Sequence, residues 1–300
     1  MTLAPRAVVV SRRSELDELL ARHGTRAAAA YFLRQRGRDM SEVDGRHAAL
    51  QKAKLAVGNA IPAQWRRGHV DRDDLPRFLF GPEDVVLAVG PDGLVANVAK
   101  YLDGQPVIGV NPEPGVNPGV LVQHDPAAIA DLLRSRMLPM SERAMVTAEL
   151  DDGQELFGLN EVYCGHPTHQ SSRYVLSTPD GQRERHSSSG VVVGTGTGAT
   201  GWCASIARAF KGAPPLPAAE ERALCWFVRE AWPSPATGVS ATSGLLTGTD
   251  RLELTCTSER LVVFADGLES DRLELSWGQR VRIGLAARSL CLVSAGVVVG

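Results

Sequence analysis

The chain has 300 residues, of which 44% are hydrophobic and 22% are charged, so it can fold as one large globular domain or two ordinary ones. Its 32 basic and 34 acidic residues give a formal net charge of -2, which argues against a protein whose main partner is nucleic acid. No stretch approaches the roughly 20 apolar residues of a membrane helix, and the start lacks the apolar core of a signal peptide. The five scattered cysteines lack a C-x-x-C pair, so we expect a cytoplasmic protein without a disulfide framework.

Strand-like and helix-like segments alternate along the first part of the chain. The pattern predicts a buried strand over 6–10 and helices over 14–21, 25–36 and 41–60, with Ser14 as the N-cap of the first helix.

The clearest unit begins with a strand expected over 84–89. It continues through a turn and a helix over 94–102 to a further strand over 106–110. Strand, helix and strand in this order form a βαβ unit with parallel strands. We therefore expect residues 1–140 to form a Rossmann-like α/β domain with a parallel sheet.

The second half consists mainly of short runs rich in Val, Leu and Thr between turn residues, which predicts a β-rich, sandwich-like domain over 141–285. Three hairpins are expected, over 173–186, 251–265 and 272–285. The remaining predicted elements are helices over 202–211 and 220–231, loops over 212–217 and 233–248, and a C-terminal strand over 286–300. Packing against the first domain is one arrangement open to that last strand.

The turn Gly90-Pro91-Asp92-Gly93 is the first of two glycine-rich segments that could carry chemistry. Between a parallel strand and a helix, backbone N–H groups face the carboxyl edge of the sheet and can bind phosphate. A carboxylate at that position suits a proton acceptor for a substrate hydroxyl, or a metal ligand. The alternative is an ordinary turn, since Pro, Asp and Gly are favoured in turns.

The second glycine-rich segment has G-x-G-x-x-G at Gly196, Gly198 and Gly201, between an expected strand and helix. A dinucleotide-binding fingerprint would place an acidic residue ~20 residues later, at the end of a strand, and none is there. One interpretation is a Gly/Thr loop whose amides and hydroxyls approach a polyphosphate or a ribose. The other is a set of structural glycines in a β-rich bend.

Two further dipeptides, Asn160-Glu161 and Asp266-Gly267, complete a series of four motifs in chain order. The series resembles the NAD kinase family, which has a GGDG turn, an Asn-Glu pair, a stretch similar to S-D-G-x-x-x-x-T-P-T-G-S-T-A-Y, and a late Asp-Gly. The resemblance extends from about Asp84 to Leu285, and Gly119-Val120-Leu121 is similar to the family's G-F-L segment.

This resemblance implies a kinase that transfers a phosphoryl group from ATP or polyphosphate, with Mg²⁺, to the 2′-hydroxyl of NAD and so forms NADP. It also implies a homodimer or homotetramer, and it assigns to Asp92 the activation of the acceptor hydroxyl. The residues that it implies for nucleotide binding are Gly90, Gly93, Asn111, Asn160, Glu161, Ser189, Thr197, Gly198, Thr200, Gly201, Trp202 and Asp266.

Two departures from the family pattern affect specificity. Pro91 replaces the second glycine of GGDG, and Ser189 replaces the aspartate of S-D-G, which in the family contacts the nicotinamide end of the dinucleotide. Two alternatives therefore stay open. One is a kinase of the same fold that acts on another hydroxyl acceptor, such as a sugar, polyol or nucleoside, and the other is a non-catalytic nucleotide-binding relative.

Two other residue groups have part of the composition of a functional site. Cys164, His166 and His169 form C-x-H-x-x-H, but no fourth ligand is evident, so no metal site is predicted. His186 precedes three serines, yet no G-x-S-x-G segment is present, so a serine-rich hairpin end is the simpler interpretation.

Overall fold

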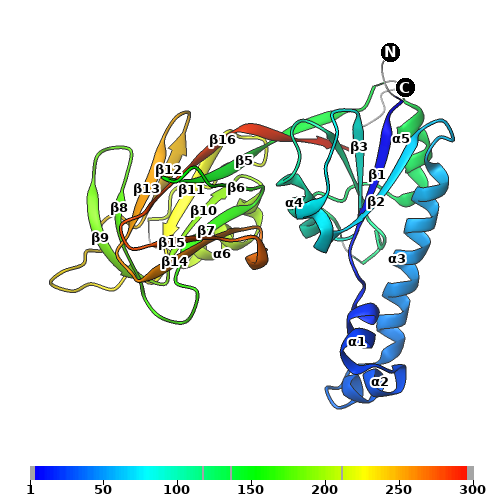
Figure 1. Ribbon diagram of the computed structural model, residues 1–300, viewed down its shortest axis with the longest axis horizontal. Helices are drawn as coiled ribbons and strands as arrows, with labels where there is room; N and C mark the ends of the chain where they lie inside the picture. The colour runs from blue at the N-terminus through cyan, green and yellow to red at the C-terminus, as the bar shows by residue number, and fades with distance from the viewer. Residues whose placement is uncertain (1–3, 117, 136, 211, 296–300) are drawn as a thin grey trace. The chain divides into compact units, whose positions relative to one another are not determined.

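The computed structural model describes residues 4–116, 118–135, 137–210 and 212–295. They fall into two compact units: the chain up to Ser141 together with the chain from Cys291, and Glu142–Leu290 (Figure 1). The protein has a mixed α/β fold, in which one sheet contains parallel strands and the other is antiparallel. Among the described helices, none is long and apolar enough to cross a membrane.

The first unit is built on parallel strands in the order β2-β1-β3-β4. They are β1 (Arg6–Ser11), β2 (Arg66–Asp71), β3 (Asp84–Val89) and β4 (Pro106–Val110). β3 and β4 are neighbours joined by α4 (Asp92–Ala99), which confirms the predicted βαβ unit. The sequence RRGHVD of the edge strand β2 has too few apolar residues to predict a strand.

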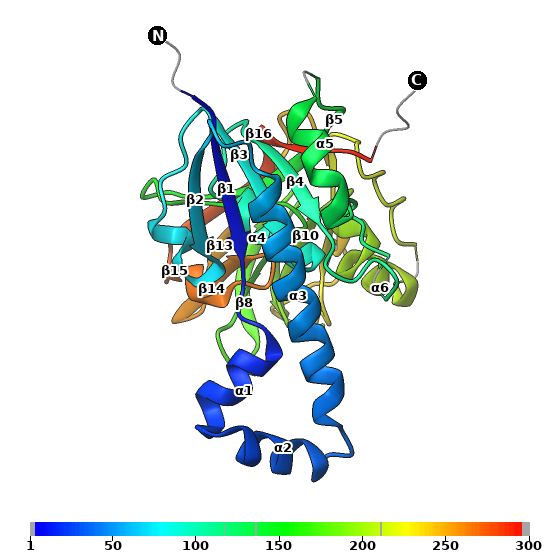
Figure 2. The same ribbon diagram turned by 90° about the vertical axis from the view of Figure 1, so that its right-hand side faces the viewer.

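The predicted helices of the first unit are confirmed near their expected bounds. They are α1 (Glu15–His23), α2 (Arg26–Arg34) and α3 (Met40–Ala60), and the unit also has α5 (Ile129–Arg134), η1 (Arg72–Arg77) and η2 (Pro126–Ala128). Ser14 and Asp17 form a reciprocal capping box at the start of α1. Leu16, Leu33 and Val43 join α1, α2 and α3 through a small apolar cluster, and Figure 2 shows α1 and α2 beside the first half of α3.

Further along α3, residues spaced as one helix face cover the parallel strands. Leu50, Ala53 and Val57 are buried together with Val9 and Leu87. Because β1, β3 and β4 are parallel, the segments that follow them all leave the same edge of the sheet.

The second unit contains an antiparallel sheet with the order β12-β11-β10-β7-β14-β15, and a second group of strands with the order β16-β13-β8-β9. The first sheet consists of β7 (Glu161–Gly165), β10 (Val191–Thr195), β11 (Ala223–Val228), β12 (Ser243–Thr247), β14 (Arg260–Ala265) and β15 (Leu273–Ser276). The other strands are β5 (Met140–Leu150), β6 (Glu155–Gly158), β8 (Ser172–Ser177), β9 (Arg183–Ser188), β13 (Arg251–Cys256) and β16 (Arg280–Val293). The unit also has α6 (Trp202–Ala209), η3 (Gly198–Thr200) and η4 (Glu269–Asp271).

One of the three predicted hairpins is confirmed and two are wrong. β8 and β9 pair directly across the turn that contains Gly181. β13 pairs with β8 and β16, whereas β14 pairs with β7 and β15, so the segments over 251–265 lie in different sheets. For the same reason β15 and β16 do not pair. Leu254 and Val263 instead belong to one apolar core to which both sheets contribute, and burial of this core decides the pairing.

Two other expectations about the second unit need correction, and the strand expected over 286–300 is present in part. The helix expected over 220–231 is the strand β11, all six residues of which are buried, so its sequence lacks the alternation that marks a half-buried strand. The loop expected over 233–248 contains β12. The strand expected over 286–300 is the continuation of β16, which pairs with β4 at Cys291 and Leu292, and residues 296–300 lie outside the described part of the chain.

Candidate functional site

A cavity of about 500 Å³ lies in the first unit, where β1, β3 and β4 end. Its lining comes from the segments after these strands, from α3, and from the segment around Gly119. This edge of a parallel sheet is where ligands bind in open α/β folds. The structure therefore places the predicted Gly90, Asp92, Gly93 and Asn111 around one cavity.

The N-terminus of α4 opens toward this cavity. No side chain caps it, because Pro91 at the N-cap makes no side-chain hydrogen bond. A Cβ built on Gly93 would meet no atom within 4 Å, so the space next to the first turn of α4 is open. Uncapped N–H groups and the positive end of the helix make this turn suitable for binding an anion.

The carboxylate of Asp92, the first residue of α4, binds a neighbouring segment of the cavity lining. Its Oδ1 accepts N–H hydrogen bonds from Val120 at 3.1 Å, Leu121 at 2.7 Å and Val122 at 2.9 Å. Its Oδ2 accepts from the Val120 N–H at 3.0 Å. Gly119 has φ +65°, and a Cβ there would lie 2.5 Å from the Val122 carbonyl oxygen, so this loop requires a glycine. Asp92 thus fixes the loop that also lines the cavity.

Asn111 is fixed where β4 ends. Its backbone N–H donates to the His124 carbonyl at 2.9 Å, and its side-chain oxygen accepts the Glu113 N–H at 2.9 Å. Asn111 is buried, and Glu113 lines the same cavity as a half-buried carboxylate.

Arginines are the part of the cavity lining that was missing from the sequence-based prediction. Arg12 and Arg13 follow β1, and Arg46 extends from α3. Arg46 is paired with Glu42 at 2.8 Å, whereas neither Arg12 nor Arg13 has an ion pair or hydrogen bond with any described residue. Their position directly after a parallel strand is the sequence signal that could have suggested them.

In the second unit, the structure brings together Asn160, Glu161 and Asp266. The Asp266 carboxylate accepts the N–H groups of Leu159 at 2.9 Å, Asn160 at 2.7 Å and Glu161 at 3.3 Å. Asp266 itself has φ +53°, a left-handed conformation that Asp tolerates better than most residues. Asp266 therefore fixes the connection between β6 and β7, as Asp92 fixes its own loop.

Glu161 is a titratable group of this cluster whose pKa is shifted toward the neutral form. Burial, and secondarily the nearby charge of Asp266, raise the pKa of Glu161 to about 7. Its carboxyl group therefore changes charge close to physiological pH.

The glycines of the segment from 194 to 201 pack closely against the protein itself. A Cβ on Gly196 would lie 1.7 Å from the Ala218 carbonyl oxygen, and one on Gly198 would lie 2.1 Å from the Asn160 carbonyl oxygen. The N–H groups of Thr197 and Gly198 donate to the Thr195 hydroxyl. These N–H groups already donate hydrogen bonds within the protein, which favours a structural role for the glycines.

Other predicted residues of this segment lie near the Asn-Glu pair or beside an aromatic group. The Thr197 hydroxyl is buried without a hydrogen-bond partner among the described residues. Thr200 donates to the Thr197 carbonyl, whereas Gly201 is exposed. Trp202 stacks on Tyr163 at 6.0 Å, and the Tyr163 hydroxyl donates to the carbonyl of the exposed Ser189 at 2.9 Å.

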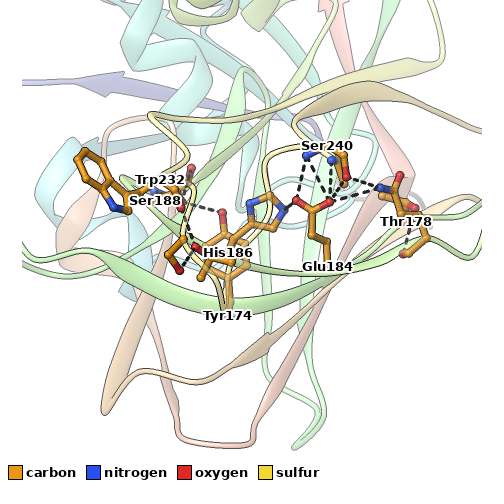
Figure 3. Close-up of polar contacts among 12 residues, drawn as sticks. Tyr174, Thr178, Glu184, His186, Ser188, Trp232 and Ser240 are labelled. Carbon is orange, nitrogen blue, oxygen red and sulfur yellow. Dashed lines mark hydrogen bonds and ion pairs between the residues drawn. The ribbon is translucent and has the colours of Figure 1, made fainter.

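His186 is not part of a nucleophilic pair (Figure 3). Its Nε2 lies 3.5 Å from Oε1 of Glu184, and the ring stacks on the Tyr174 ring with 5.5 Å between the ring centroids. The Ser188 hydroxyl instead contacts the Tyr174 hydroxyl at 2.7 Å, and Glu184 accepts N–H groups of Ser240 and Ala241. Burial lowers the pKa of His186, so the structure supports a neutral, packed imidazole.

Within the described residues, no group of three or more His, Cys, Asp and Glu side chains is arranged to hold a metal ion, and Cys164, His166 and His169 form no such group. No protein-family model matches the chain, and no curated protein is similar enough to it to count as a match.

Proposed function

We propose that the protein is a phosphotransferase related to the NAD kinases, with NAD as its phosphoryl acceptor, a Rossmann-like first unit and a sandwich-like second unit. The observation that carries the proposal is the cavity at the carboxyl ends of β1, β3 and β4, which combines the uncapped N-terminus of α4 with the carboxylate of Asp92. An anion site next to a proton acceptor is what transfer of a phosphoryl group to a hydroxyl requires.

In the proposed reaction, Asp92 accepts the proton of the acceptor hydroxyl, and the oxygen of that hydroxyl attacks the terminal phosphorus of the donor. The bond between that phosphorus and the bridging oxygen breaks, and ADP or a shortened polyphosphate leaves. Oδ2 of Asp92 suits this role, because it accepts one N–H whereas Oδ1 accepts three. The N–H groups at the start of α4 would stabilise charge on the transferred group.

In the proposed reaction, Mg²⁺ enters the cavity bound to the phosphates of the donor. The oxygen-bearing side chains that line the cavity after β3 and β4 are those of Asp92, Asn111 and Glu113, which suits an ion held mainly by phosphate oxygens and water. When bound, the ion would neutralise charge on the donor phosphates.

The direct test is NADP formation from NAD by the purified protein with Mg²⁺ and either ATP or inorganic polyphosphate. We expect Asp92→Asn to lower turnover by about 10²- to 10⁴-fold, the usual contribution of a positioned proton acceptor. Because Asp92 also fixes residues 120–122, the melting temperature and ATP binding of the variant are measured beside turnover.

Asp125→Asn is the matched control, because Asp125 caps η2 in the same unit and does not line the cavity. Near-full turnover of Asp92→Asn would remove the assigned role of Asp92. Absence of NADP with both donors would remove NAD kinase activity.

A second candidate is a kinase of the same type that acts on a different hydroxyl acceptor. The exposed Ser189, which stands where the family has an aspartate for the nicotinamide end of NAD, favours it. Release of ADP with a nucleoside, sugar or polyol, but not with NAD, would select this candidate.

A further inference from the structure

Several arginines of the α1–α3 region form ion pairs with acidic residues, whereas Arg12 and Arg13 form none with the described residues. Arg26 pairs with Asp44, Arg38 with Glu15, and Arg46 with Glu42. Arg12 and Arg13 are exposed, line the cavity, and have no acidic partner among the described residues. Two adjacent guanidinium groups without a carboxylate can accept an anionic ligand without first breaking an ion pair.

The charges around the cavity are divided between its walls. The arginines come from the β1–α1 connection and α3, whereas Asp92 and Glu113 lie in the segments after β3 and β4. The third carboxylate of the lining, Glu15, is already neutralised by Arg38. A phosphate chain is therefore attracted to the arginines, which form the arginine wall, and is repelled by the carboxylates of Asp92 and Glu113. An uncharged hydroxyl can lie beside these carboxylates.

We propose that Arg12 and Arg13 bind the phosphate chain of the phosphoryl donor, so that the donor is a polyphosphate compound that reaches from this wall to the N-terminus of α4. This inference rests on the proposed function, because it identifies the class of ligand for the same cavity. The two anion-binding features come from different segments, the β1–α1 connection and the start of α4, so a ligand with several linked phosphates can use both. The cavity thus selects ligands with several linked phosphates over orthophosphate.

The first experiment measures binding to the whole chain by calorimetry, with tripolyphosphate, ATP, adenosine and orthophosphate as probes. We expect tripolyphosphate and ATP to bind, and adenosine and orthophosphate to bind at least about tenfold more weakly, since each charge-assisted pair of hydrogen bonds adds roughly a factor of ten. Competition between ATP and tripolyphosphate shows whether the adenosine part adds affinity, which distinguishes a nucleotide donor from an inorganic one.

The second experiment compares the double variant Arg12→Ala/Arg13→Ala with Arg22→Ala/Arg34→Ala. The control removes the same charge from exposed arginines of α1 and α2 that do not line the cavity. We expect the first variant to weaken tripolyphosphate binding by about tenfold or more and to flatten its dependence on salt, and the control to leave both unchanged. Equal effects of the two variants, or none, would overturn the inference.

The inference and the proposed function fail in different ways. Arginine-dependent binding of tripolyphosphate without transfer to any hydroxyl acceptor would retain the inference and remove the kinase activity. Transfer with unchanged tripolyphosphate binding in Arg12→Ala/Arg13→Ala would retain the kinase activity and remove the inference.

Discussion

Among single residues, Asp92 and Asp266 each fix a loop, one in each unit. Each carboxylate accepts backbone N–H groups of three consecutive residues, 120–122 and 159–161 respectively. Such bonds fix a loop that has no regular secondary structure to hold it. A substitution of Asp92 can therefore lower turnover either by removing a proton acceptor or by releasing residues 120–122, and the melting temperature of Asp92→Asn distinguishes these two causes.

Glu161 gives a prediction about pH. The pKa of Glu161 is raised from 4.5 to about 7 in the folded protein, so the folded state holds a proton that the unfolded state has lost between these two values. The stability of the protein therefore falls as pH rises from 4.5 to 7, by on the order of 3 kcal/mol from this group, and is constant above that range.

We expect Glu161→Gln to remove this dependence, because glutamine does not titrate. The melting temperature of Glu161→Gln minus that of the wild-type protein should increase from pH 5 to pH 8. Glu259→Gln, at an exposed position, is the control and should show no such growth. A melting-temperature difference that is the same at pH 5 and pH 8 would contradict the raised pKa of Glu161.

At the scale of elements, α3 is the helix that joins the cavity to the α1–α2 cluster. It contributes Arg46 to the cavity, Val43 to the small cluster, and Leu50 and Val57 to the core of the parallel sheet. Its stability therefore supports the arginine wall.

Two glycines inside α3 weaken it without a packing reason. A Cβ on Gly45 or Gly58 would meet no atom within 4 Å, and neither residue has a positive φ. We expect Gly45→Ala/Gly58→Ala to raise the free energy of unfolding by about 1–2 kcal/mol, since alanine is favoured over glycine by roughly 0.5–1 kcal/mol at each helix position. Denaturant unfolding measures the change.

Gly109→Ala is the contrasting variant, because a Cβ there would lie 2.1 Å from the Leu121 carbonyl oxygen. It should destabilise the protein. A destabilising effect of the α3 variant as well would show that the helix needs flexibility at these glycines.

At the scale of the whole molecule, the first unit depends on the end of the chain. Leu292 pairs with Val107 of β4, Val293 is fully buried in the core of the first unit, and the Ser294 N–H donates to the Pro139 carbonyl at 2.8 Å. The first unit is therefore complete only after the second unit has been synthesised.

We expect a chain that ends at Leu290 to lose stability selectively in the first unit. Removal of the buried Leu292 and Val293 side chains alone withdraws about 1.5–3 kcal/mol each. Hydrogen exchange should accelerate in β3 and β4 and stay unchanged in β10 and β11. A chain that ends at Ala295 keeps these contacts and serves as the control, and equal exchange in the two truncated chains would contradict the prediction.

Local sequence patterns were sufficient to predict the main helices of the first unit and its βαβ unit. Helical spacing, the Ser14 cap and apolar runs are properties of neighbouring residues, so the helices α1 to α3 and the strands β1, β3 and β4 could be predicted from them. The order of motifs along the chain also indicated Asp92 and Asn111, which line one cavity.

Tertiary structure alone decided which strands pair and which side chains meet. β13 and β14 are separated by only three residues but lie in different sheets, because their buried faces contribute to a core shared by both sheets. β11 resembles a helix in sequence because it is buried on both faces. Arg12 and Arg13 reach the same cavity as Asp92 only through the parallel register of β1 and β3. Contacts between residues so distant in sequence depend on sheet register and core burial, which no local pattern encodes.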